Sequence, residues 1–167
     1  MLPHATLIAE IPRLRRYGRA LTGDRARADD LVQDTLERAL QHREKWAGGS
    51  ARAWLFTLMH RIWLNQVRRP QADSLDDGDL APDQPVAALQ DRWGDSRDLE
   101  QALARLPDEQ REVLLLVALE EFSYEEAAEV LGIPVGTVMS RLFRARERLR
   151  RMLERSPFPQ PALKRVK

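Results

Sequence analysis

The chain has 167 residues, enough for one domain or two small ones, and its lack of cysteine excludes disulfide bonds and thiolate metal sites. Its 27 Lys/Arg nearly balance 26 Asp/Glu, so the net charge of +1 does not by itself indicate a partner. The longest apolar run, Val113 to Leu119, has seven residues where roughly 20 are needed to span a bilayer, so we expect a soluble cytoplasmic protein with no direct membrane insertion.

Three amphipathic helices are expected in residues 1–69, because apolar residues recur there every three or four positions. The first stops at Thr22-Gly23, and the second follows directly. The third covers roughly residues 51–68 and ends at Pro70, after a break at Gly48-Gly49. Thirteen Lys/Arg against seven Asp/Glu give this part of the chain a net charge of +6. We predict that it forms one basic helical domain.

An acidic segment separates this domain from the rest of the chain. Residues 70–98 hold eight Asp/Glu against two Lys/Arg, together with prolines and glycines. The segment has too few bulky apolar residues to bury much surface. We therefore predict a flexible, extended linker.

Residues 99–155 are predicted to form a second helical domain. Helices are expected from about 99 to 106 and, after Pro107, from 108 to 120. No stretch of the sequence alternates apolar and polar residues as a half-buried strand does. The expected fold class is therefore all-α, with two small helical domains joined by a flexible acidic linker, and with residues 156–167 as a disordered tail.

The second domain ends in a predicted helix-turn-helix. Ser123 and Glu126 have the spacing of a capping box, which starts a helix, and Gly132 can adopt the positive φ that ends one. From Pro134 onward a second helix follows, and the chain there holds ten Lys/Arg against two Asp/Glu. Recognition helices place such side chains against base edges and phosphates in the major groove. A basic face can also serve solubility alone, but its place in a helix-turn-helix favours DNA binding.

Two stretches of the chain resemble the bacterial extracytoplasmic-function (ECF) sigma factors, the minimal two-domain members of the sigma-70 family. The first runs from Leu21 to Leu40, with Asp-Asp-Leu-Val-Gln-Asp-Thr at 29–35, and resumes at 53–62. The second runs from Leu106 to Arg148. A helix-turn-helix alone fits many regulators, whereas the acidic motif ahead of it fits very few. The resemblance implies an alternative sigma factor that directs core RNA polymerase to specific promoters and starts transcription in a stress response.

The resemblance assigns the second helix to the clamp helices of the polymerase beta-prime subunit. A polar and acidic helix face can pair with arginines on a partner and set its orientation. A solvated helix face is the alternative interpretation. The residues implied are Asp30, Gln33, Asp34, Glu37 and Arg38.

The following loop and helix resemble the part of the family that captures the melted minus-ten element. Single-stranded DNA needs cations for its phosphates and flat or polar groups for its bases. Many relatives carry Asn at the position of Arg61. Trp46, Trp54 and Trp63 are either stacking platforms or core residues, and core is the commoner role for tryptophans at helical spacing. The DNA-contacting residues implied are Ser50, Arg52, Arg61, Asn65, Arg68 and Arg69.

The helix-turn-helix resembles the minus-thirty-five reader of the family. Relatives commonly carry Lys or Arg where this chain has Met139, so we expect a different promoter preference. The residues implied are Thr137, Met139, Ser140, Arg141, Phe143, Arg144, Arg146 and Arg148. The acidic linker would occupy the channel that nascent RNA enters later, with its carboxylates imitating phosphates.

The partners that the resemblance implies are core RNA polymerase, through its beta-prime and beta subunits, promoter DNA, and an anti-sigma factor that clamps one or both domains. One rival interpretation is a dimeric helix-turn-helix regulator that does not bind polymerase. The other is an enzyme, but His4, His42 and His60 are scattered, and the sequence has neither a His-Glu-x-x-His motif nor a phosphate-binding loop. We expect no catalytic residues, no metal and no cofactor.

Overall fold

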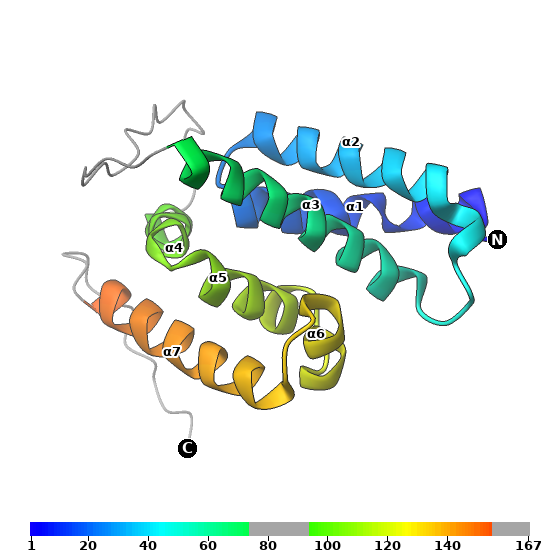
Figure 1. The fold of residues 1–167 in the computed structure, drawn as a ribbon. Coiled ribbons are helices and arrows are strands. Elements are labelled where there is room, and N and C mark those ends of the chain that lie inside the picture. Colours follow the sequence, from blue (N-terminus) through cyan, green and yellow to red (C-terminus); the bar gives the residue numbers. More distant parts are fainter. Residues whose placement is uncertain (74–93, 155–167) are drawn as a thin grey trace, which may run out of the picture.

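The computed structural model describes residues 1–73 and 94–154, and the regular elements in these two ranges are helices (Figure 1). This confirms the predicted all-α fold class. The N-terminal unit consists of α1 (His4–Thr22), α2 (Arg25–His42), a short 3-10 turn η1 (Arg43–Lys45) and α3 (Ala51–Asp73). The C-terminal unit consists of α4 (Gly94–Arg105), α5 (Asp108–Leu114), a π-helical turn η2 (Leu115–Leu119), α6 (Tyr124–Leu131) and α7 (Val135–Glu154).

Local capping explains the tight turn between the first two helices. Gly23 adopts a left-handed φ of 67°, and its N–H donates to the Arg19 carbonyl at the end of α1. Asp24 then accepts a hydrogen bond of 2.9 Å from the Ala26 N–H and starts α2. The two helices can therefore pack side by side.

The predicted helix-turn-helix is confirmed at its start and at its turn. Ser123 Oγ accepts from the Glu126 N–H at 3.1 Å, and the Glu126 carboxylate accepts from the Ser123 N–H at 2.8 Å. Gly132 ends α6 with a φ of 65°. Val138 and Leu142 are buried on the inner face of α7, so the opposite face is left to solvent.

The capping box supplies a first testable prediction. Replacing Ser123 with alanine removes the acceptor for the Glu126 N–H and lowers the free energy of unfolding by about 1 kcal/mol. Urea unfolding followed by circular dichroism measures the change. Ser123→Thr keeps a hydroxyl and is the matched control. Equal stability of the alanine and wild-type proteins would contradict the capping role.

Three helix limits differ from the sequence prediction. α3 continues through Pro70 to Asp73, because a proline near the end of a helix removes only one backbone hydrogen bond. α4 begins at Gly94, ahead of the predicted start near 99. Helices thus extend into both ends of the predicted linker, whose remainder lies outside the described residues, as does the predicted tail 156–167.

The third difference lies in the long apolar helix predicted over 108–120. It is α-helical only to Leu114 and then forms the π-helical turn η2. The wider turn shifts the register, so Leu115 and Leu116 are buried while Ala118 is exposed. Periodicity alone does not reveal such a register change.

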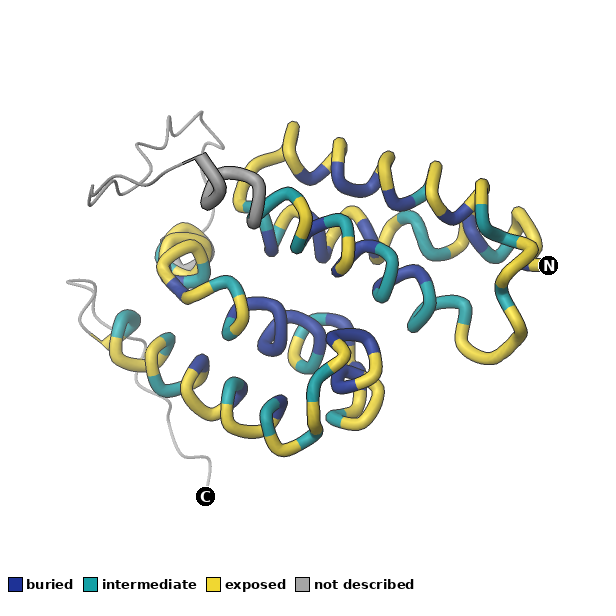
Figure 2. The backbone as a smooth tube through the Cα atoms, viewed as in Figure 1, coloured by how far each residue is buried: buried dark blue, intermediate teal, exposed yellow. Residues whose placement is uncertain are grey.

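The two units pack against each other. α3 lies between α2 and the C-terminal unit, and it contacts α6; α7 packs on α5 and α6 on the far side (Figure 1). α1 also contacts α4, α5 and η2. In Figure 2 the buried stretches of α3 and α5 face the middle of the molecule, while the outer sides of α2 and α7 are exposed. One continuous apolar core therefore runs through both units.

Candidate functional site

The polar face of α2 is exposed along its length. Leu31, Val32 and Thr35 are buried on the opposite side, as the predicted apolar stripe requires. Gln33 donates a 3.4 Å hydrogen bond to Glu37, and Gln66 of α3 donates to Asp34 at 3.4 Å. All five residues expected to bind polymerase lie on the exposed face: Asp30, Gln33, Asp34, Glu37 and Arg38. The face is mainly acidic and suits a basic partner.

The described side chains expected to bind the minus-ten element lie just ahead of α3 and on two different sides of it. Arg61 and Asn65 are exposed and one helical turn apart. Arg52 precedes Arg61 by nine residues, which is two and a half turns at 3.6 residues per turn, so it lies on the opposite side. Ser50 is exposed, and its Oγ accepts from the Ala53 N–H at 3.1 Å at the start of the helix.

Arg52 is directed at the C-terminal unit. Its Cζ atom lies 4.1 Å from the centre of the Phe122 ring, a cation–π distance. Its Nε and Nη2 atoms are buried and lack a hydrogen-bond partner in the structure. Arg68 and Arg69 belong to α3, but their side chains lie outside the described part of the chain. Among the predicted minus-ten residues whose side chains are described, Arg61 and Asn65 lie together on an exposed face of α3.

Trp46, Trp54 and Trp63 lie in or against the apolar core, as the core interpretation expects. Trp63 is buried, and the guanidinium of Arg27 lies 5.7 Å from the centre of its ring. Trp46 and Trp54 are partly buried and pack against the same core. Neither is fully presented to solvent as a stacking platform.

The outer face of α7 combines cations with two large apolar side chains. Met139 and Phe143 are one turn apart and 52% and 68% exposed. Thr137 is half-buried, and Arg141 is half-buried with a 3.5 Å ion pair to Glu109 of α5. The remaining predicted residues are exposed: Ser140, Arg144, Arg146 and Arg148. The helix thus presents hydrogen-bond donors and apolar groups together, which is what major-groove recognition requires.

Charged groups that sequence reasoning missed lie between the two units. Arg16 of α1 donates through Nε and Nη2 to the two oxygens of Glu120, each at 3.0 Å. The Glu120 side chain is completely buried, whereas that of Arg16 is 52% exposed. The hydrogen bonds and charge of Glu120 raise the pKa of Arg16. His60 Nδ1 of α3 lies 2.7 Å from Glu112 Oε1 of α5, and both residues are buried.

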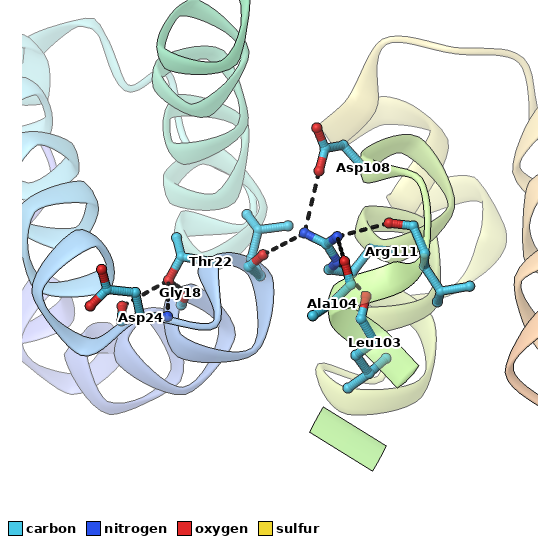
Figure 3. A network of polar contacts seen from close by, with 9 residues as sticks. Gly18, Thr22, Asp24, Leu103, Ala104, Asp108 and Arg111 are labelled. Atoms are coloured by element: carbon cyan, nitrogen blue, oxygen red, sulfur yellow. Dashed lines mark hydrogen bonds and ion pairs between the residues drawn. The ribbon is translucent and has the colours of Figure 1, made fainter. Parts of the chain in front are cut away.

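Arg111 joins three helix ends at the same interface (Figure 3). Burial lowers its pKa, with Asp108 and Glu112 acting in the opposite direction. A guanidinium has five N–H donors, and here each has an acceptor. The acceptors are the carbonyls of Leu103 (2.7 Å), Leu21 (2.9 Å), Ala104 (2.9 Å) and Leu106 (2.8 Å) and the carboxylate of Asp108 (3.3 Å). The carbonyls lie at or near the ends of α1 and α4, where the helix dipoles favour a cation.

Within the described ranges, no helix is both long and apolar enough to cross a bilayer. No three His, Asp or Glu side chains of these residues gather where they could hold a metal ion.

Two family models match the chain. Sigma-70, region 4 matches residues 96–149, and the Sigma2 domain of PhyR matches residues 7–60. ECF RNA polymerase sigma factor EcfG of Rhodopseudomonas palustris is 39% identical over 149 residues, covering 88% of this chain and 82% of the relative. RNA polymerase sigma factor YlaC of Bacillus subtilis is 36% identical over 137 residues, covering 77% and 79%.

Two solved sigma-factor structures are also similar to the chain over most of its length. The sigma factor RpoE of Bartonella quintana, in complex with the anti-sigma factor NepR, is similar at a TM-score of 0.72 and 31% identity, covering 90% of this chain and 95% of RpoE. CnrH, in complex with the cytosolic domain of CnrY, is similar at a TM-score of 0.63 and 27% identity, covering 89% and 84%.

Proposed function

The chain belongs to the ECF RNA polymerase sigma factors, which direct core RNA polymerase to promoters, and we propose that its two units contact separate promoter elements while bound to the polymerase. Residues 1–69 would bind polymerase and the minus-ten element, and residues 99–155 would bind the minus-thirty-five element. The ranges of the two family matches, 7–60 and 96–149, support this division. Residues 70–98 would join the two in a cytoplasmic, stress-responsive factor.

The observation that carries the proposal is the outer face of α7. An intact capping box and a left-handed Gly132 position this helix as the second of a helix-turn-helix. Its exposed Arg144, Arg146 and Arg148 supply phosphate and base contacts. Met139 and Phe143 supply apolar surface of the kind that contacts the C5-methyl group of thymine. A face built only for solubility would not expose two large apolar side chains among arginines.

The proposed minus-ten residues differ in their place in the structure, and Arg68 and Arg69 stay in the proposal although their side chains lie outside the described residues. Arg61 and Asn65 would contact the melted strand from the exposed side of α3. Arg52 would reach that strand only if the C-terminal unit moved away from it, because it is covered by Phe122. Ser50 would act mainly by fixing the start of α3.

We also infer an anti-sigma partner. The solved RpoE structure contains the anti-sigma factor NepR, and its fold matches this chain over nearly its whole length. An anti-sigma factor that clamps one or both units would keep the chain inactive until the inducing signal arrives.

Transcription in vitro tests the proposed function. Core RNA polymerase is incubated with a random promoter library with and without the chain, and transcripts are sequenced. The proposed function requires a shared promoter motif that appears only with the chain. If core polymerase initiates no differently in its presence, the proposed function is wrong. A stable dimer that ignores polymerase in gel filtration would favour the regulator alternative.

Polymerase binding supplies a second prediction. Asp30→Lys on the exposed face of α2 should weaken binding to core polymerase by about tenfold or more, because a lysine there meets the cations expected on the partner. Fluorescence anisotropy of a labelled chain measures the affinity. Glu44→Lys is the matched control, since Glu44 is exposed in η1 outside the predicted face. An equal loss in both variants would point to general charge repulsion and contradict the assignment.

A further inference from the structure

We propose that Met139 on the outer face of α7 is an oxidation site, and that its conversion to methionine sulfoxide by a peroxide weakens binding to the minus-thirty-five element. The proposal rests on the proposed function, because it assumes that this face of α7 contacts DNA. It adds a direct chemical input to the DNA-binding surface of the chain.

The four methionines of the chain differ in their access to an oxidant. Met59 is completely buried in the core, and Met152 is partly buried near the end of α7. Met1 and Met139 are 68% and 52% exposed, so a dissolved peroxide can reach both in the free chain. Met1 precedes α1, away from the two proposed DNA-contacting helices. Met139 is therefore the accessible methionine whose oxidation can act on DNA binding.

The oxidation step is simple because the chain has no cysteine to compete for the peroxide. The O–O bond of hydrogen peroxide breaks, and one oxygen atom forms the S=O bond of Met139. The other oxygen leaves as water, so the sulfur loses the two electrons that the peroxide gains. Methionine sulfoxide reductases reverse the change, with one enzyme for each epimer.

Oxidation would change the chemistry within the proposed recognition face. The outer side of α7 is exposed (Figure 2), and Met139 and Phe143 lie together on it because they are one helical turn apart. An apolar pair of this kind can pack on the C5-methyl group of a thymine. A sulfoxide is polar and chiral, and burying it against a methyl group is unfavourable unless it gains a hydrogen-bond donor. The oxidised chain should therefore bind DNA more weakly.

The fold should tolerate this change. Val138 and Leu142 are buried on the packed side of α7, whereas Met139 is exposed on the other side. Oxidation of Met139 should therefore leave the circular dichroism spectrum and the free energy of unfolding nearly unchanged. Binding to core polymerase through α2 should be unchanged as well. These measurements separate an effect on DNA recognition from general oxidative damage.

The test measures DNA binding of the full chain before and after treatment with hydrogen peroxide. The probe is a duplex that carries the minus-thirty-five motif selected from the random promoter library. Met139→Leu keeps an apolar side chain of similar volume but has no sulfur. Met152→Leu is the matched control, since it makes the same replacement at a partly buried position of the same helix. Each variant is compared with its own untreated form, so a change in starting affinity does not affect the result.

Oxidation should weaken DNA binding of the native chain and of Met152→Leu by about tenfold, the factor expected for loss of one apolar side-chain contact. Met139→Leu should keep its own affinity through the treatment. The two methionine sulfoxide reductases should restore binding of the oxidised native chain. Peptide mass spectrometry should find much more sulfoxide at Met139 than at Met59, and the bound duplex should slow its formation at Met139.

The proposal is overturned if Met139 stays reduced, if the oxidised native chain binds as tightly as the reduced chain, or if Met139→Leu loses as much affinity as Met152→Leu. It is also overturned if the reductases do not restore binding, or if the duplex does not protect Met139. Specific binding that survives oxidation contradicts only this proposal. If no motif is selected with the untreated chain, the proposed function is wrong, and this proposal falls with it.

Discussion

Replacing Arg111 with methionine should lower the free energy of unfolding by about 3–5 kcal/mol, a large part of the roughly 5–15 kcal/mol that a domain has. Methionine fills similar space but donates no hydrogen bond. The carbonyls of Leu21 and Leu106 would remain buried without their donor, and those of Leu103 and Ala104 would lose theirs as well. Because Leu21 belongs to the other unit, the loss should affect both the C-terminal unit and its contact with α1.

Urea unfolding followed by circular dichroism measures this effect. Arg111→Lys should recover only part of the stability, because an ammonium group has three donors in place of a planar fork of five. Arg105→Ala is the control, since Arg105 is exposed in the last turn of α4 and its loss should cost less than about 0.5 kcal/mol. A methionine variant within 1 kcal/mol of the native chain would mean that the five hydrogen bonds contribute little.

The sequence predicted those parts of the fold whose determinants are local. Ser123 and Glu126 are three residues apart, and the capping box they form depends on little beyond their own helix turn. Gly132 ends α6 because of its own backbone freedom. The exposed faces of α2 and α7 follow from the spacing of apolar residues, so most predicted polymerase and minus-thirty-five residues lie on exposed faces in the structure.

The interface between the units could not be predicted in the same way. Its charged contacts join residues 104, 52 and 90 positions apart, in the pairs Arg16–Glu120, His60–Glu112 and Arg111–Leu21. Charged residues beside an apolar run are usually exposed, so the sequence favours solvent for Glu112 and Glu120. The position of Arg52 over Phe122 could not be predicted either, because it depends on how the two units pack. Long-range pairing decides these positions, and one sequence carries no local signal for it.

Recognition of the minus-thirty-five element should depend strongly on Arg144. Arg144→Ala should weaken binding of the chain to its promoter by roughly ten- to a hundredfold, the range expected for loss of a guanidinium contact to a base edge. Polymerase binding and folding should be unchanged, because Arg144 is exposed on the outer face of α7 and far in sequence from α2. Arg150→Ala is the matched control on the same helix, since Arg150 pairs with Glu147 and Glu154 of α7 itself.

The Arg144→Lys variant distinguishes between a base contact and a phosphate contact of the Arg144 guanidinium. A bidentate base contact is lost with lysine, so the variant should bind almost as weakly as the alanine variant and should tolerate other bases at one promoter position. Lysine keeps a phosphate contact. If Arg144 contacts a phosphate, the alanine variant loses that contact, and the slope of log affinity against log salt concentration should become about one unit shallower. Gel-shift titrations over several salt concentrations, with single-base promoter variants, separate the two. If Arg144→Ala reduces polymerase binding as much as promoter binding, or reduces neither, the assignment of α7 to the minus-thirty-five element is wrong.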